Sequence, residues 1–251
     1  MAKSSLTGLL LAAVVGCSSP ELKMLSEEQL AEKEQLTSLA EQLVGNNSGR
    51  PKLYDEEAIH SFLNRSLGLV LAIQENAFGI THDQIPEIAI QVIEFNLAGA
   101  YDPRTETIHL SPGADYIYGF RKALDHELGH FYTHQLAKLL AVEWNPFIMG
   151  NTRQQEIACR LISEGIAEYV SQTIHGQETT ASGPWPRNVL NLDEKNIYDG
   201  GYNLVKPILE LEFKTGVEYL LAHQPVNDLQ DLQGYQIKAV EEVVKILSLK
   251  K

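Results

Sequence analysis

The feature that most constrains this chain is the stretch DHELGHFYTH, residues 125–134, in the middle of a sequence of 251 residues. His126 and His130 stand four positions apart, and Glu127 directly follows the first of them. On an α-helix, two such positions lie about 40° apart around the axis and about one turn apart along it. Both imidazoles can therefore reach the same cation, while Glu127 is rotated away from it and can reach a water bound there. The spacing predicts a helix that contributes two metal ligands and a carboxylate base.

A catalytic zinc site takes three protein ligands and keeps a fourth position for water. The metzincin pattern would require a histidine at position 136, and Leu136 excludes that class. The next predicted helix contains RLISEGIAEYVS, where Glu164 could supply a carboxylate oxygen. The competing interpretation is an amphipathic helix whose polar face happens to carry His126, His130 and His134.

His126, Glu127, His130 and Glu164 together resemble the gluzincins, the superfamily of thermolysin and the zinc aminopeptidases. In that superfamily a second helix supplies a glutamate ligand, often within an N-E-G-x-A-x-Y stretch. Here residues 163–169 read S-E-G-I-A-E-Y, with Ser163 in place of the asparagine. The resemblance implies a zincin-like catalytic domain in which His126, His130 and Glu164 bind Zn²⁺.

A tyrosine downstream of the third ligand also matches one branch of the superfamily. In the zinc aminopeptidases, a Tyr-x-x-Gly segment places a tyrosine hydroxyl on the developing oxyanion. Tyr198, at the start of YDGGY, fits that pattern and order. A hydrogen-bond donor at this place stabilises charge that develops in the transition state. Tyr202 is the competing candidate, and a purely structural tyrosine remains open.

Four further residues near these motifs have simpler interpretations. Glu168 either orients a ligand histidine through its second ring nitrogen, as outer-shell carboxylates do, or is a solvated carboxylate. His134 is expected on the exposed face of its helix rather than at the site. Asp125 is expected to be an ordinary polar helix residue, and Cys159 a small buried core residue.

The resemblance implies zinc-dependent hydrolysis of peptide bonds, with Glu127 as the proton acceptor and donor. The G-x-M-E-N segment with which zinc aminopeptidases recognise a free N-terminus does not occur ahead of the histidine helix. An endopeptidase is therefore expected, and the substrate stays undefined. Two alternatives remain: an inactive zinc-binding lipoprotein that binds an envelope protein or peptide, and a structural envelope protein with incidental histidines.

The N-terminal residues indicate secretion. MAKSSLTGLLLAAVVGC has a positive charge at Lys3 and an apolar run from about Leu6 to Val15, which is too short to cross a bilayer as a helix. Residues 14–17 resemble the lipobox of bacterial lipoproteins, which implies lipid on Cys17; an ordinary signal peptide is the alternative. Ser18 and Ser19 lack the aspartate that retains lipoproteins at the inner membrane, so an outer-membrane anchor in a bacterial envelope is expected. The predicted organisation is a signal peptide over 1–16, a tether and helix over 17–50, and a metallopeptidase domain over 51–251.

Patterning along the chain predicts an α+β domain, a small mixed sheet or hairpin followed by mostly helices. The net charge of -13 argues against a nucleic-acid partner. Alternation predicts a hairpin of strands over about 87–96 and 106–110, joined by the turn DPRTE. In gluzincins the strand before the histidine helix is a sheet edge that pairs with substrate, and 106–110 is expected to be that strand. Helices are expected over about 26–44, 55–75, 118–142, 152–174, 198–215 and 239–247.

Overall fold

The computed structural model describes residues 64, 67–68, 71, 79, 87–90, 99–110, 116–142, 152–175 and 194–250. The predicted signal peptide, the lipidation site at Cys17 and the predicted helix over 26–44 lie outside these residues. Within the predicted helix over 55–75, the described residues 64, 67, 68 and 71 are all helical.

Three short strands form a mixed sheet in the order β1-β3-β2. β2 (Gly99–Asp102) and β3 (Thr107–Leu110) are antiparallel and form a hairpin, with Gly99 opposite Leu110 and Asp102 opposite Thr107. In the connecting turn, the Arg104 guanidinium and backbone N–H donate hydrogen bonds to the Asp102 carboxylate. β1 (Glu87–Ile90) runs parallel to β3 on its other side.

This topology corrects two predictions. The strands predicted over 87–96 and 106–110 do pair with each other, but in parallel, so they do not form a hairpin; the hairpin partner of the second strand is residues 99–102. β3 is also not a sheet edge: it lies between β1 and β2, which are the two edge strands of the described sheet. Alternation identifies a strand and its two faces but not its neighbours, which are chosen by non-local contacts.

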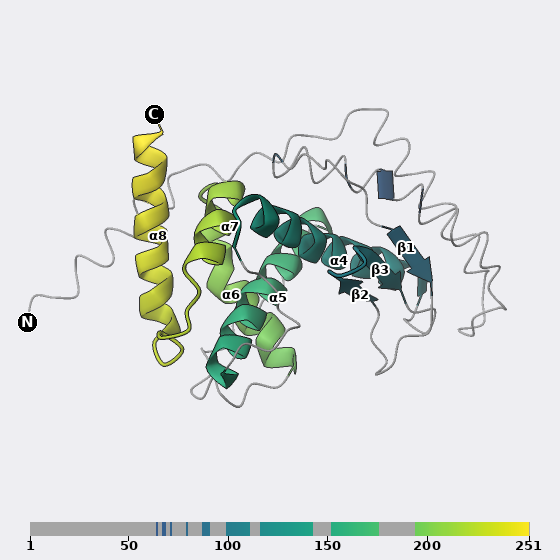
Figure 1. Cartoon of the computed structure of the whole chain (residues 1–251), viewed down its shortest axis with the longest axis horizontal. Coiled ribbons are helices and arrows are strands. Elements are labelled where there is room, and N and C mark those ends of the chain that lie inside the picture. The colour runs from purple at the N-terminus through teal and green to yellow at the C-terminus, as the bar shows by residue number, and fades with distance from the viewer. Residues whose placement is uncertain are drawn as a thin grey trace, which may run out of the picture.

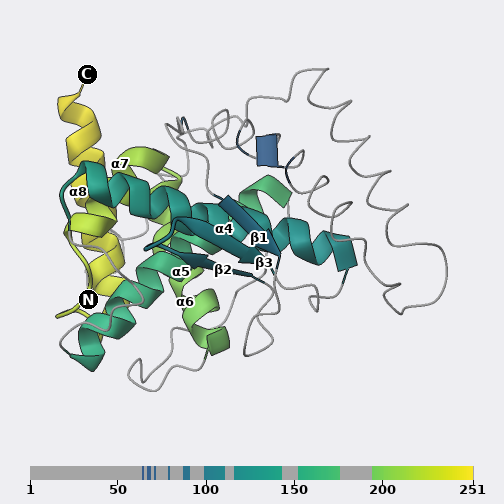
Figure 2. The ribbon, with the colours of Figure 1, turned by 45° about the vertical axis from the view of Figure 1, so that its right-hand side comes forward.

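Five helices follow the sheet in the described chain: α4 (Tyr116–Leu139), α5 (Arg153–His175), α6 (Glu194–Leu209), α7 (Phe213–Ala222) and α8 (Leu232–Leu249). α4 lies against β2 and β3, and α5 packs between α4 and α6. Figures 1 and 2 show the sheet beside α4 at one end of the helices and α8 at the opposite end, where it contacts α6 and α7. The predicted α+β class is confirmed.

The predicted helices over 118–142 and 152–174 correspond closely to α4 and α5, but two others need correction. The predicted helix over 198–215 is divided into α6 and α7. Glu212 is extended at φ -166° and ψ 121°, and its carboxylate accepts hydrogen bonds from the N–H groups of Lys214 and Thr215, which caps α7. Glutamate is not a favoured N-cap residue, so the sequence gives little sign of this break. α8 begins well before residue 239, after Asp231 caps the N–H of Gly234.

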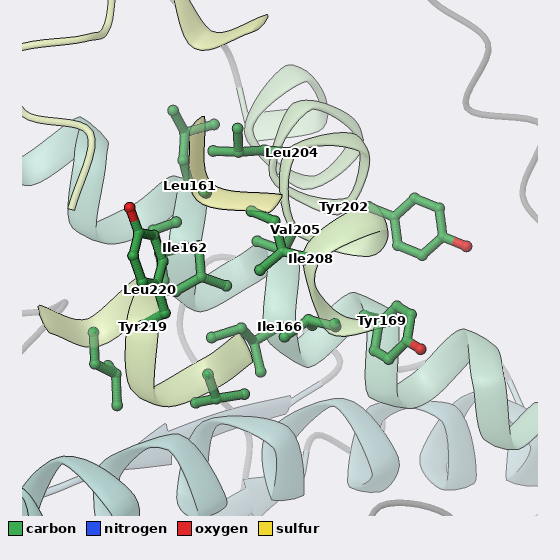
Figure 3. Close-up of a cluster of buried hydrophobic side chains, with 14 of the residues drawn as sticks. Leu161, Ile162, Ile166, Tyr169, Tyr202, Leu204, Val205, Ile208, Tyr219 and Leu220 are labelled. Atoms are coloured by element: carbon green, nitrogen blue, oxygen red, sulfur yellow. The ribbon is translucent and has the colours of Figure 1, made fainter. Parts of the chain in front are cut away.

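The main hydrophobic cluster holds α5, α6 and α7 together. Figure 3 shows Leu161, Ile162 and Ile166 of α5 facing Val205 and Ile208 of α6 and Leu220 of α7. Each of these side chains is fully buried. The same cluster includes Tyr132, Leu136 and Ala137 of α4, so it also joins α5 to the C-terminal half of the histidine helix. None of the described helices combines the length and the apolar character that crossing a bilayer requires.

Candidate metal centre

Small residues let α5 approach its two neighbouring helices closely. A Cβ atom added at Gly129 of α4 would lie 2.7 Å from the Cα of Ala167, so the two backbones are nearly in contact there. On its other side, Gly165 of α5 lies against the carbonyl group of Gly201 in α6. Because glycine has no side chain, these contacts bring the histidine helix and the Glu164 helix to a short, fixed separation.

The side chains of His126, His130 and Glu164 converge across the α4–α5 contact. Glu164 Oε2 lies 3.2 Å from His126 Nε2 and 3.4 Å from His130 Nε2. The three possible donor atoms lie within 4.8 Å of one another, and the residues can hold a metal ion. Donor atoms about 2.1 Å from a tetrahedral ion are about 3.4 Å apart, so the spacings around Glu164 fit such an ion.

The second nitrogen of each imidazole has its own partner on α5. His130 Nδ1 lies 2.9 Å from the hydroxyl oxygen of Ser163, and His126 Nδ1 lies 3.4 Å from Glu168 Oε2. If each Nδ1 carries the proton and donates it to these oxygens, each Nε2 keeps its lone pair for a cation. The Glu168 contact agrees with the orienting interpretation of that residue. Ser163 was not predicted, and its one signal is that it directly precedes Glu164 in the asparagine position of the pattern.

Burial and opposite charge determine the electrostatics of the cluster. Burial disfavours protonated His126, but hydrogen bonds to the carboxylates of Glu164 and Glu168 outweigh it and raise the pKa of His126 to about 10. Burial also disfavours charged Glu164, yet the positive charges and hydrogen bonds of His130 and His126 hold the pKa of this carboxyl well below its usual range. The cluster is thus built to keep a carboxylate ionised beside a cation.

Glu127 faces the sheet rather than α5. Its carboxylate accepts a hydrogen bond from the backbone N–H of Tyr101 in β2, and its side chain lies against Gly99 of the same strand. Burial raises the pKa of the Glu127 carboxyl, against the lowering effect of His130 and His126. A buried carboxyl with a raised pKa beside a candidate metal site is suited to accept and return a proton.

The two candidate tyrosines occupy different environments. The Tyr198 ring lies beside the cluster, with its centroid 5.6 Å from that of His126. Tyr202 instead belongs to the hydrophobic core, where its ring lies 6.4 Å from Tyr169 by centroids (Figure 3). Of the two, Tyr198 is the tyrosine that lies next to the candidate metal ligands.

Two residues lie in surroundings that the sequence did not predict. His134 is half-buried rather than exposed, and its Nδ1 is 2.8 Å from the hydroxyl of Tyr101. Asp125 is fully buried rather than an ordinary polar residue of a helix surface. Cys159 is partly buried against the core, as expected, and its thiol lies 3.0 Å from Gln224 Oε1.

Comparison of the chain with protein-family models, with curated proteins and with solved structures found no match. The geometry and chemistry of the cluster therefore carry the functional argument.

Proposed function

We propose that this protein is a zinc metallopeptidase of the gluzincin type, with a zincin-like catalytic domain. The observation that carries the proposal is the cluster itself: Glu164 Oε2 lies between the Nε2 atoms of His126 and His130. Ser163 and Glu168 contact the opposite ring nitrogens, and the three donor atoms lie within 4.8 Å of one another. Two imidazoles and one carboxylate are a ligand set typical of catalytic zinc, which keeps one position open.

The residues around the cluster support this proposal. A bound Zn²⁺ would acidify a water molecule and polarise a carbonyl group. Glu127 accepts the proton of the attacking water and passes it to the leaving amine. Tyr198 donates its hydroxyl hydrogen to the oxyanion of the tetrahedral intermediate. Ser163 and Glu168 keep the two imidazoles in the tautomer and orientation that ligation needs.

We also propose that the domain is anchored to the bacterial outer membrane by lipid on Cys17, as the lipobox implies. An endopeptidase that acts on a peptide or protein of the cell envelope fits this location and fits a chain without the aminopeptidase recognition segment. This part of the proposal is supported by the sequence alone.

The proposal is tested by incubating the full chain with a diverse peptide mixture and identifying cleavage sites by mass spectrometry. We expect cuts with the zinc-loaded protein, none after chelation, and a loss of at least about 10³-fold in rate for Glu127→Gln. Glu242→Gln, the same change on the exposed face of α8, is the matched control and should cleave at the parent rate. Zinc binding without any cleavage would favour the inactive, partner-binding alternative. Cleavage by Glu127→Gln at the parent rate would remove this residue from the mechanism.

A further inference from the structure

The side chains of α4 divide between two neighbours. His126 and His130 are directed to α5, whereas Glu127, Phe131 and His134 lie one turn apart along a second stripe that contacts β2. On β2 the facing positions are Gly99 and Tyr101, which share one side of the sheet because side chains alternate along a strand. The candidate general base therefore belongs to the helix–strand contact, and the metal ligands belong to the helix–helix contact.

A side chain at position 99 would be crowded by Glu127 and Leu110. A Cβ atom at this position would lie 3.0 Å from Glu127 Cγ, 3.1 Å from Glu127 Oε1 and 3.2 Å from a methyl carbon of Leu110. Leu110 is fully buried in β3 and cannot retreat without disturbing the sheet. The side chain that must move in response is the carboxylate arm of Glu127.

The rest of β2 is fastened to the same stripe of α4. The Tyr101 ring packs edge-on against Phe131, with centroids 5.8 Å apart, and its hydroxyl lies 2.8 Å from His134 Nδ1. Tyr101 is 3% exposed, so this attachment is well packed. It holds the backbone N–H of Tyr101 where it donates to the Glu127 carboxylate. One strand thus contacts both the stem and the head group of Glu127.

We propose that β2 is a positioning element for the general base, and that Gly99 is a positioning residue that sets the place of the Glu127 carboxylate by lacking a side chain. The inference rests on the proposed function for its catalytic meaning, but the geometric claim holds for the protein with or without a metal. A methyl group at position 99 requires the Glu127 carboxylate arm to shift by a few tenths of an ångström. Because displacement of a catalytic group by about 1 Å can cost about 10²-fold in rate, we expect a loss of about tenfold. Gly99→Ala should therefore affect the chemical step far more than metal binding.

The first experiment compares the full chain, Gly99→Ala and the control Ala100→Ser, whose side chain lies on the other side of the sheet. We expect Gly99→Ala to bind zinc within about threefold of the parent and to lose about tenfold in kcat with little change in KM. In the Co²⁺-substituted Gly99→Ala protein, the pH at which the cobalt absorption spectrum changes should shift towards the pH found for Glu127→Gln. If Gly99→Ala matched Ala100→Ser both in kcat and in the cobalt titration, the proposal would be overturned.

A second experiment separates this inference from the proposed function. In the metal-free protein, the ¹³C resonance of the Glu127 carboxyl carbon, assigned by its loss in Glu127→Gln, should move in Gly99→Ala and stay in place in Ala100→Ser. That result would stand even if the parent showed no turnover, and an unmoved resonance would overturn the inference.

If Gly99→Ala does not fold, Gly99→Ala/Glu127→Ala should fold because the crowded side chain is gone. Failure of this double variant to fold would equally contradict the proposal.

Discussion

Both nitrogens of each candidate ligand histidine have defined partners in the structure. Nε2 of His126 and His130 faces Glu164, and the two Nδ1 atoms face Glu168 and Ser163. A histidine that is incidental on a helix surface has no reason to be fixed at both nitrogens. The sequence could predict His126 and His130 from local spacing and Glu164 from its motif. It could not predict Ser163 as a partner of His130, because that contact depends on how α5 lies against α4.

The Ser163 hydroxyl can be tested separately from the ligands. Ser163→Ala removes the oxygen that faces His130 Nδ1 and should lower zinc affinity by about 10–100-fold, the usual effect of losing an outer-shell partner. Ser248→Ala on α8, whose hydroxyl donates a hydrogen bond to the backbone carbonyl of Lys245, is the control. Competition with a chromophoric chelator gives both affinities. Equal affinities for the two variants would show that Ser163 does not orient the ligand.

The raised pKa of His126 predicts a pH dependence of zinc binding. In the metal-free protein this imidazole is protonated below its pKa of about 10, and a cation can bind only the neutral ring. One proton should therefore leave for each ion bound, so the affinity should rise about tenfold per pH unit between about pH 7 and pH 9. The affinity should fall as the solution becomes more acidic, since protonation competes with the metal. Calorimetry in buffers of different ionisation enthalpy would measure the proton release, and a pH-independent affinity would contradict this account.

At the scale of elements, α5 is the part on which the site depends most. Gly129 and Ala167 set its distance from α4, Gly165 and Gly201 set its distance from α6, and apolar side chains fill the space around α7. The sequence predicted α4 and α5 well because long helices have a stronger local signal than short elements. It missed the division between α6 and α7, where Glu212 begins a new helix, and it paired the strands incorrectly. Both errors concern contacts that a local pattern does not contain.

The α5–α6 contact should not tolerate a methyl group. Gly165→Ala would place a Cβ against the Gly201 carbonyl, which is backbone and cannot turn aside. We expect a loss of about 1–3 kcal/mol in the free energy of unfolding, together with weaker zinc binding as Glu164 is displaced. Gly200→Ala is the control, because its Cβ would approach no atom closer than 3.7 Å. Urea unfolding of the metal-free variants measures the first effect, and equal midpoints would refute the tight contact.

At the scale of the whole molecule, a bound ion would link two helices that the chain connects through residues 140–152. Ligands from α4 and α5 make the folded state the one that binds, so zinc should stabilise it by mass action. At a free zinc concentration about 1,000 times the dissociation constant, the gain is about 4 kcal/mol. Thermal unfolding should occur at a higher temperature with zinc in the parent and not in His130→Ala. An identical shift in both would place the stabilising ion elsewhere.

The proposed membrane anchor also belongs to the whole molecule. Cys17→Ser should abolish incorporation of labelled fatty acid and should prevent recovery of the mature protein in the outer-membrane fraction. Cys159→Ser is the matched control, because that thiol is partly buried against the core and should accept no lipid. Labelled lipid that persists in Cys17→Ser would contradict the lipobox assignment.

The most direct test of the central claim is the metal content of the full chain, measured by native mass spectrometry on the parent, Glu164→Ala and Glu127→Gln. The account predicts one zinc ion per parent chain, retention of that ion in Glu127→Gln, and its loss in Glu164→Ala. Glu127 lies outside the ligand set, whereas Glu164 Oε2 contacts both imidazoles. A parent chain that binds no zinc, or a Glu164→Ala chain that binds it as the parent does, would contradict the proposed metal centre.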